Sequence, residues 1–185
     1  MIEDIKTKLN EQMTKSIKSL QTQLLKVRTG RANANALDGV TVDYYGSPTP
    51  IAQVGQISTP EARLLQIQPF DKTLIAEIEK AIINANLGLN PGNDGNLIRI
   101  QFPALTEETR KDLVKQVKKL AEDAKISIRN SRRDQNEIVK KAEKDKEITE
   151  DDVKKFGDEI QKITDSFVKQ VDEVMTAKEK ELMTV

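Results

Sequence analysis

Basic side chains recur at helical spacing in one stretch of the chain, where they could bind a polyanion. They are Lys111, Lys115, Lys118, Lys125, Arg129 and Arg132, and the stretch closes on the cluster RNSRR at residues 129–133. Steps of three, four or seven residues place them on one side of an α-helix. Arginine guanidinium groups match paired phosphate oxygens, so the pattern favours an RNA or DNA backbone. A solvated helix face without a partner explains the same spacing equally well.

The overall charge does not require this clustering, because 30 Lys and Arg balance 30 Asp and Glu. Residues 110–133 contain nine basic and three acidic side chains, a net charge of +6, whereas residues 134–185 contain ten and fifteen, a net charge of −5. At about 100° per residue, the basic stripe lies roughly 140° from the apolar seam of the same helix. We therefore expect these side chains to face solvent, with Arg132 closest to the flank.

Catalytic chemistry has little support in the composition. The chain contains no Cys and no His, which excludes thiol nucleophiles, disulfides, imidazole bases and the commonest metal ligands. The acidic run Glu150-Asp151-Asp152 is better explained as a helix start than as a metal site. We expect no catalytic residue, no metal, no cofactor and no enzymatic activity.

Three long amphipathic helices are predicted to position the stripe. The first carries an apolar residue at every third or fourth position from Ile2 to Val27 and is expected to end at Gly30. The second begins after a Thr106 cap, and the third after a capping box of Thr149 and Asp152. The predicted seam of the second helix consists of Leu113, Val117, Leu120, Ala124, Ile128, Ser131, Gln135, Ile138 and Ala142.

Residues 37–102 read instead as a small α+β module. Short apolar runs at 40–45, 52–57, 64–67 and 97–102 predict strands, and the segments 46–50 and 90–95 predict turns. One helix is expected between the third and fourth strands, from Asp71 or Thr73 to Gly88. The pair Tyr44-Tyr45 is expected to pack on the sheet, with an exposed contact surface as the alternative.

No single amphipathic helix can bury its apolar stripe alone, so we expect the three to pack together. The resulting fold class is α+β: an elongated, antiparallel three-helix bundle of residues 1–30 and 104–185, with residues 31–103 inserted as a small β/α/β domain. Two segments connect these domains, and we expect a hinge near 30–31 and 103–105, at Gly30, Arg31, Pro103 and Ala104. The expected shape is an elongated, bent rod.

No apolar run approaches the roughly 18 residues that a membrane-spanning helix needs, and the N-terminus is acidic and amphipathic. We expect a cytoplasmic protein that does not enter a membrane.

Seven segments together resemble the bacterial ribosome recycling factors along the whole chain. They are KVRTGRA at 26–32, LDGV at 37–40, YYGSPTP at 44–50, NLGLNP at 86–91, LTEETRKDL at 105–113, RNSRRD at 129–134 and DKEITEDD at 145–152. The resemblance implies an L-shaped molecule similar in outline to transfer RNA. Two places depart from the family pattern. Thr109 stands where the family often has a basic residue, and the small-residue stretch at 32–35 also varies.

The resemblance also implies a function and a site. A member of this family binds the post-termination ribosome and, with elongation factor G and GTP hydrolysis, splits the subunits and releases mRNA and tRNA. The arginines expected to contact large-subunit ribosomal RNA are Arg28, Arg31, Arg110, Arg129, Arg132 and Arg133, and Lys118 and Lys125 join them from the stripe. We expect a monomer. The alternative is a structural coiled-coil adaptor that does not bind RNA, which would leave the inserted module and the arginine cluster without a role.

Overall fold

The computed structural model describes residues 1–184. Two compact units divide the chain, one made of Met1–Val27 with Lys111–Met183 and the other of Arg28–Arg110. The first unit is helical, and the second holds every strand of the described chain.

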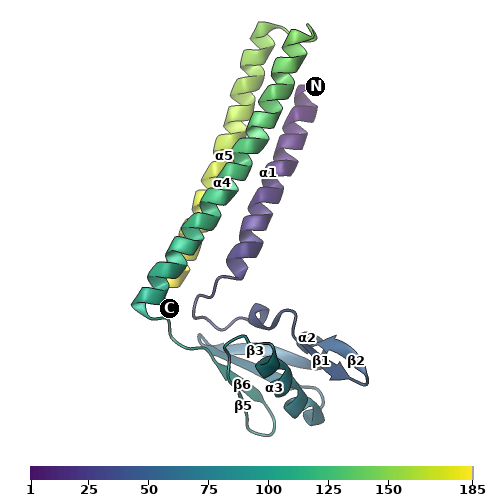
Figure 1. The fold of residues 1–185 in the computed structure, drawn as a ribbon, viewed down its shortest axis with the longest axis vertical. Coiled ribbons are helices and arrows are strands. Elements are labelled where there is room, and N and C mark those ends of the chain that lie inside the picture. The colour runs from purple at the N-terminus through teal and green to yellow at the C-terminus, as the bar shows by residue number, and fades with distance from the viewer. Residues whose placement is uncertain (185) are drawn as a thin grey trace. The chain divides into compact units, whose positions relative to one another are not determined.

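Three helices form the first unit: α1 (Ile2–Leu25), α4 (Glu107–Lys144) and α5 (Glu150–Thr184). Figure 1 shows α1 and α5 running antiparallel to α4. Polar contacts tie the helices together: the Ser16 and Ser127 hydroxyls lie 2.9 Å apart between α1 and α4, and Lys6 Nζ lies 2.5 Å from a Glu159 carboxylate oxygen on α5. The predicted antiparallel three-helix bundle is confirmed.

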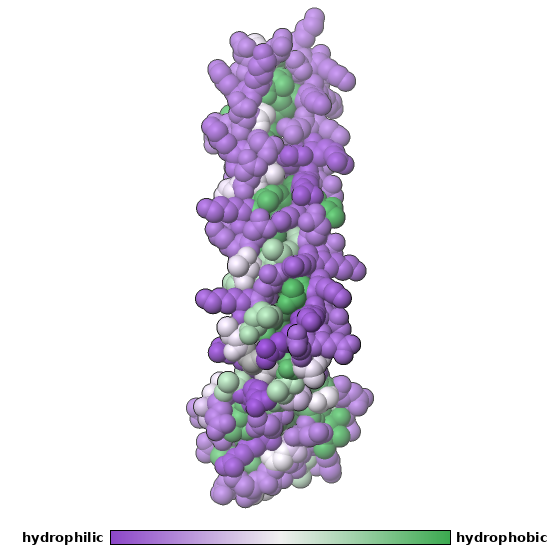
Figure 2. Space-filling view, turned by 90° about the vertical axis from the view of Figure 1, so that its left-hand side faces the viewer, coloured by the Kyte–Doolittle hydropathy of each residue, from purple (hydrophilic) through white to green (hydrophobic). Residues whose placement is uncertain are grey.

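Apolar side chains from all three helices fill the bundle core. The buried residues of α1 confirm the predicted stripe: Ile5, Leu9, Met13, Ile17, Leu20 and Leu24. The helix itself ends at Leu25, before the predicted stop at Gly30. Polar and charged residues cover the outside of the helices, and one side of the bundle shows only narrow apolar strips between them (Figure 2).

The seam of α4 differs from the predicted one in a way that affects the basic stripe. Ala121 and Val139 are buried, whereas Ile138 is 44% exposed, and Leu113 and Leu120 are only partly buried. At about 100° per residue, this moves the centre of the buried face by roughly 40° toward the basic side chains. The prediction was wrong because this helix carries apolar residues on more than one face. Contacts with the neighbouring helices determine which of them are buried.

Both predicted caps of the long helices are confirmed. The Thr106 hydroxyl accepts a hydrogen bond from the Thr109 backbone N–H at 3.1 Å. At the start of α5, the Thr149 hydroxyl accepts from the Asp152 N–H, and the Asp152 carboxylate accepts from the Thr149 N–H at 3.0 Å. These hydrogen bonds lower the pKa of Asp152, the bond from the Thr149 backbone contributing most. Local chemistry alone therefore sets the beginning of both helices.

The second unit contains two antiparallel sheets. Strands β1 (Thr41–Tyr44) and β2 (Ser47–Pro50) form a hairpin, and β3 (Gly55–Glu61), β4 (Leu64–Pro69), β5 (Pro91–Asn93) and β6 (Ile98–Gln101) form a sheet in the order β3-β4-β6-β5. Helix α3 (Ile75–Asn84) follows a 3-10 turn, η2 (Lys72–Leu74), which the Asp71 side chain caps. A second 3-10 turn, η1 (Ala34–Leu37), precedes β1, and a single α-helical turn, α2 (Ile51–Val54), joins the hairpin to β3.

Three local predictions for this unit were wrong. Residues 52–54 belong to α2 rather than to a strand, residues 47–50 form β2 rather than a turn, and residues 91–93 form β5. Proline and glycine in these segments suggested turns, but pairing with a neighbouring strand decides whether such residues become an edge strand. Tyr45 is 88% exposed at the hairpin tip, so the expected packing of the tyrosine pair on the sheet was also wrong.

The core of the second unit lies between the four-stranded sheet, the hairpin and α3. Its fully buried members come from alternate positions of the central strands and from one face of α3. They include Leu65, Ile67, Ile78, Ile82, Ile98 and Ile100. The second unit thus has a hydrophobic core of its own.

Candidate nucleic-acid interface

Five of the predicted RNA-binding side chains project from the middle of α4. They are Lys118, Lys125, Arg129, Arg132 and Arg133. At about 100° per residue they span an arc of roughly 100° on the helix surface, which we call the α4 basic strip. The prediction that these residues share one side of one helix is consistent with the single unbroken helix Glu107–Lys144. Their surroundings nevertheless differ.

Lys125 and Arg132 lie on the edge of the strip that faces α5, and both contact that helix. Lys125 Nζ lies 2.6 Å from an Asp172 carboxylate oxygen, and only 18% of the lysine side chain is exposed. Arg132 is partly buried, and its Nη1 donates a hydrogen bond to Gln161 Oε1 at 3.2 Å. Gln161 in turn donates to Asp165 at 2.7 Å. The expectation that the whole stripe faces solvent was wrong for these two residues, because the buried seam lies closer to them than predicted.

The other three members of the α4 basic strip are exposed. Arg129 pairs with Glu122 on its own helix at 3.1 Å, and half of its side chain remains accessible. Lys118 and Arg133 are exposed, and within residues 1–184 they form neither an ion pair nor a side-chain hydrogen bond. A guanidinium without an internal partner can donate hydrogen bonds to a phosphate group without first breaking a contact within the protein.

The remaining predicted arginines belong to the second unit. Arg110 is partly buried in the first turn of α4, and Arg31 is exposed in the segment before η1. The Arg28 guanidinium donates a hydrogen bond to the Leu87 carbonyl oxygen, in the loop after α3. Sequence reasoning missed this contact, since no local pattern links residues 59 positions apart.

Carboxylates of α5 form ion pairs with both of the other long helices. Besides Asp172, Glu159 accepts a hydrogen bond from Lys6, which lowers the pKa of the Glu159 carboxyl and raises that of the Lys6 ammonium. The Lys6 and Glu159 side chains are 26% and 45% exposed, so solvent partly screens the pair. The uneven charge along the sequence therefore appears in the bundle as a basic strip on α4 beside an α5 helix that carries carboxylates.

Neither a cluster of metal ligands nor a membrane-spanning helix is found in residues 1–184. No three carboxylates gather closely enough there to hold a metal ion. None of the described helices combines the length and the apolar character needed to cross a bilayer.

Comparison with known proteins places this geometry in a family. Residues 20–183 match the family model described as Ribosome recycling factor. The chain belongs to the ribosome recycling factor family. The match covers the end of α1, the whole second unit, α4 and all but the last residue of α5, so the resemblance seen in seven short segments is confirmed.

Individual family members are similar over nearly their full length. A ribosome-recycling factor of Bacillus cereus (strain B4264) is 59% identical over 176 residues, which covers 95% of each chain. One from Bacillus anthracis (strain A0248) is 58% identical over the same length.

Two solved structures of the family share the fold. A solution structure of a ribosome recycling factor superposes with a TM-score of 0.79 at 38% identity and covers 100% of this chain and 98% of its own. A second structure describes the T. thermophilus ribosome recycling factor and E. coli elongation factor G bound to the E. coli post-termination complex. It matches with a TM-score of 0.66 at 40% identity and covers 98% of each chain.

Proposed function

We propose that this protein is a translation factor that binds the post-termination ribosome. With elongation factor G and GTP hydrolysis, it separates the subunits and frees mRNA and tRNA for a new round of initiation. The observation that carries the proposal is the full-length match to ribosome recycling factors, one of which is described on a post-termination complex together with elongation factor G. The factor acts in the cytoplasm as a monomeric binding protein without catalytic residues.

The α4 basic strip is the surface that we assign to large-subunit ribosomal RNA. Its exposed members, Lys118, Arg129 and Arg133, are available to phosphate groups in the free protein. Arg132 requires only that its guanidinium exchange a neutral acceptor, the Gln161 side-chain oxygen, for a charged phosphate oxygen. Lys125 is the weakest candidate, because its short ion pair with Asp172 would have to be broken.

The second unit completes the proposed RNA contacts with Arg28, Arg31 and Arg110. We also propose that the segments Gly30-Arg31 and Pro103-Ala104 form the hinge between the two units. Arg28 requires a change of partner, since its guanidinium is bonded to Leu87. Arg31 is exposed.

The alternative, a coiled-coil adaptor, is not favoured. Such an adaptor would need only the long helices, whereas the family match also includes the whole second unit.

A subunit-splitting assay tests the proposal. Post-termination ribosomes are mixed with the protein, elongation factor G and GTP, and light scattering follows the separation of the subunits. We expect splitting only when all three are present. A double variant, Arg129→Ala with Arg133→Ala, should slow splitting, whereas the matched variant Lys154→Ala with Lys155→Ala on α5 should not. Splitting without this protein, or none in the complete mixture, would refute the proposed function.

Salt dependence separately tests the RNA assignment. Each phosphate contact contributes roughly 0.7 to 0.9 to the slope of log affinity against log salt concentration. The Arg129→Ala, Arg133→Ala double variant should therefore show a shallower slope by about 1.5. Equal slopes for the variant and the native protein would exclude these arginines as phosphate contacts.

A further inference from the structure

The hairpin of the second unit has two edges with different hydrogen-bonding capacity. Its turn residues, Tyr45 and Gly46, have φ angles of 51° and 78°, as in a two-residue type I′ turn. Tyr44 and Ser47 flank the turn as a hydrogen-bonded pair, and such pairs alternate along an antiparallel ladder. Val42 and Thr49 are therefore the next hydrogen-bonded pair.

The intervening residues direct their backbone groups away from the hairpin. Asp43 lies opposite Pro48 and Thr41 opposite Pro50, and proline has no N–H to donate. On the β2 side, the outer edge thus lacks its donors. On the β1 side, the outer edge keeps the N–H and C=O groups of Thr41 and Asp43. No other backbone or side-chain group in residues 1–184 bonds to these four groups.

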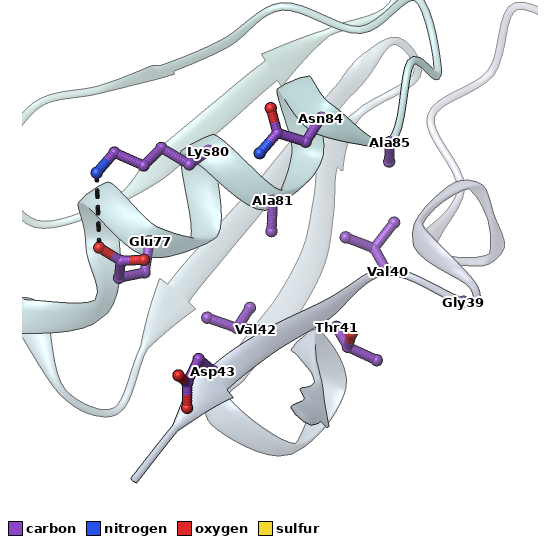
Figure 3. A pocket seen from close by; sticks show the side chains of 10 residues that line it. All are labelled: Gly39, Val40, Thr41, Val42, Asp43, Glu77, Lys80, Ala81, Asn84 and Ala85. Atoms are coloured by element: carbon purple, nitrogen blue, oxygen red, sulfur yellow. Dashed lines mark ion pairs between the residues drawn. The ribbon is translucent and has the colours of Figure 1, made fainter. Parts of the chain in front are cut away.

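The open edge of β1 borders a groove. The groove has a volume of about 420 Å³ and lies between residues 39–43 and one face of α3, formed by Glu77, Lys80, Ala81, Asn84 and Ala85. Val42 on β1 and Val40 just before it point toward α3, and Ala81 points back toward them (Figure 3). The wall is mixed, because Ala81 and Ala85 lie beside Glu77, Lys80 and Asn84, so alternate side chains of an added strand would meet both apolar and polar groups.

The other outer strands of the two sheets are less suited to pairing. Proline interrupts each of them, at Pro48 and Pro50 in β2, Pro60 in β3 and Pro91 in β5. The edge of β3 also contains an irregularity between Ser58 and Glu61. Prolines and bulges are the usual means of preventing strand addition. Strand β1 has neither, so its edge is the one left able to pair.

Charge further specifies the ligand. Lys80 lies 3.7 Å from a Glu77 carboxylate oxygen across the groove wall, whereas Asp43 makes no ion pair in residues 1–184. A cation opposite Asp43 would be favourable, because cross-strand pairs of opposite charge stabilise a sheet.

We propose that the groove between β1 and α3 binds an extended segment of a partner protein by strand addition, with a Lys or Arg side chain opposite Asp43. The segment pairs antiparallel with β1, and two of its residues, separated by one, exchange backbone hydrogen bonds with Asp43 and Thr41. The inference does not depend on the proposed ribosomal function, since it rests on the hairpin register and the groove alone.

The probe is an acetylated and amidated pentapeptide, Val-Lys-Val-Thr-Ser, titrated into the full-length, ¹⁵N-labelled protein. We expect the largest NMR shifts at the amides of Thr41 and Asp43 and along the lining face of α3. The peptide's second residue pairs with Asp43, so N-methylation of its backbone nitrogen should weaken binding by about tenfold or more. N-methylation of the third residue, whose N–H points away from β1, should change affinity little.

Two protein variants accompany the peptides. Asp43→Lys should weaken binding by about fivefold through charge reversal, while the exposed control Glu61→Lys on β3 should not. Thr41→Pro removes one N–H group from the outer edge of β1. The pairing of β1 with β2 does not use this N–H. If that variant fails to fold, Asp43→Lys and the N-methylated peptides still decide the question.

Shifts located elsewhere, or equal affinity for the two N-methylated peptides, would overturn the proposal. So would shifts at Thr41 and Asp43 that grow with protein concentration alone and accompany dimer formation in sedimentation, because the edge would then pair with a second copy of the chain.

Discussion

Arg132 and Arg133 are adjacent in the sequence but have different surroundings on α4. Arg132 is partly buried and bonded to Gln161 on α5, whereas Arg133 is exposed and has no bonded side-chain partner among residues 1–184. The reason is angular: Arg132 is about 100° closer to the buried seam. Stability and ribosome binding should therefore respond differently to the two arginines.

We expect Arg132→Ala to lower the free energy of unfolding by about 0.5–1 kcal/mol, because the bond to Gln161 is lost. Arg133→Ala should change it by less than about 0.5 kcal/mol. Both variants should weaken ribosome binding, Arg133→Ala by about tenfold if its guanidinium binds phosphate. Chemical denaturation and a ribosome co-sedimentation assay measure the two quantities. Native affinity for both variants would remove them from the proposed interface.

At the scale of the element, two glycines make a matched pair for backbone substitution. A Cβ at Gly55, which begins β3, would lie 2.9 Å from the Gln68 carbonyl oxygen and 3.1 Å from Pro69 Cα. Both atoms belong to the backbone of β4, so they cannot move aside cheaply. At Gly157 in α5, a Cβ would meet no atom within 4 Å.

Gly55→Ala should therefore destabilise the second unit by about 1–3 kcal/mol through overpacking. Gly157→Ala should instead stabilise the bundle by about 0.5–1 kcal/mol, because alanine loses less conformational entropy in a helix. Thermal unfolding of each variant, followed by circular dichroism, gives the sign. Stabilisation by Gly55→Ala would show that β3 and β4 can separate at this point.

The capping box of α5 makes a pH-dependent contribution. Hydrogen bonds from Thr149 lower the pKa of Asp152 below its unfolded value near 4. The stabilisation is therefore present above about pH 4 and is lost as the pH falls through the lower, folded pKa.

Asp152→Ala should reduce the free energy of unfolding near pH 7, because the carboxylate that accepts from Thr149 is lost. The difference from the native protein should shrink as the pH falls below about 4 and through the lower, folded pKa. Urea denaturation between pH 2 and pH 7 tests this, and Asp151→Ala, a neighbour outside the box, serves as the control. A difference that is constant with pH would mean that the carboxylate is not the stabilising acceptor.

At the scale of the whole molecule, the chain crosses between the two units after Val27 and after Arg110, and the proposed hinge residues lie in the second unit near these crossings. Gly30 has a φ angle of 77°, which few other residues adopt, and Pro103 and Ala104 lie between the end of β6 and the start of α4. Each unit has its own core, so movement at the connections need not disturb either.

We therefore predict that the units change their separation in solution. The chain has no native cysteine, so Thr22→Cys in α1 and Thr59→Cys in β3 allow specific dye attachment. Single-molecule fluorescence should show a broad or multiple distribution of distances. A control pair within the bundle, Lys8→Cys and Lys162→Cys, should show one narrow distribution. Equally narrow distributions for both pairs would contradict a hinge.

The amino-acid sequence alone determined the features that depend on near neighbours. The three long helices, the Thr106 and Thr149 caps and the core face of α1 follow from periodicity and from contacts within about four residues. The family resemblance extended this to the architecture, which the structure confirms.

Tertiary structure decided the rest, because the deciding contacts join distant residues. The position of the α4 seam depends on α1 and α5, so only folding shows that Asp172 pairs with Lys125 while Arg133 remains exposed. Likewise, residues 47–50 and 91–93 become strands because β1 and β6 pair with them. Strand pairing gains stability from partners across the sheet rather than along the chain, and no local pattern records that choice.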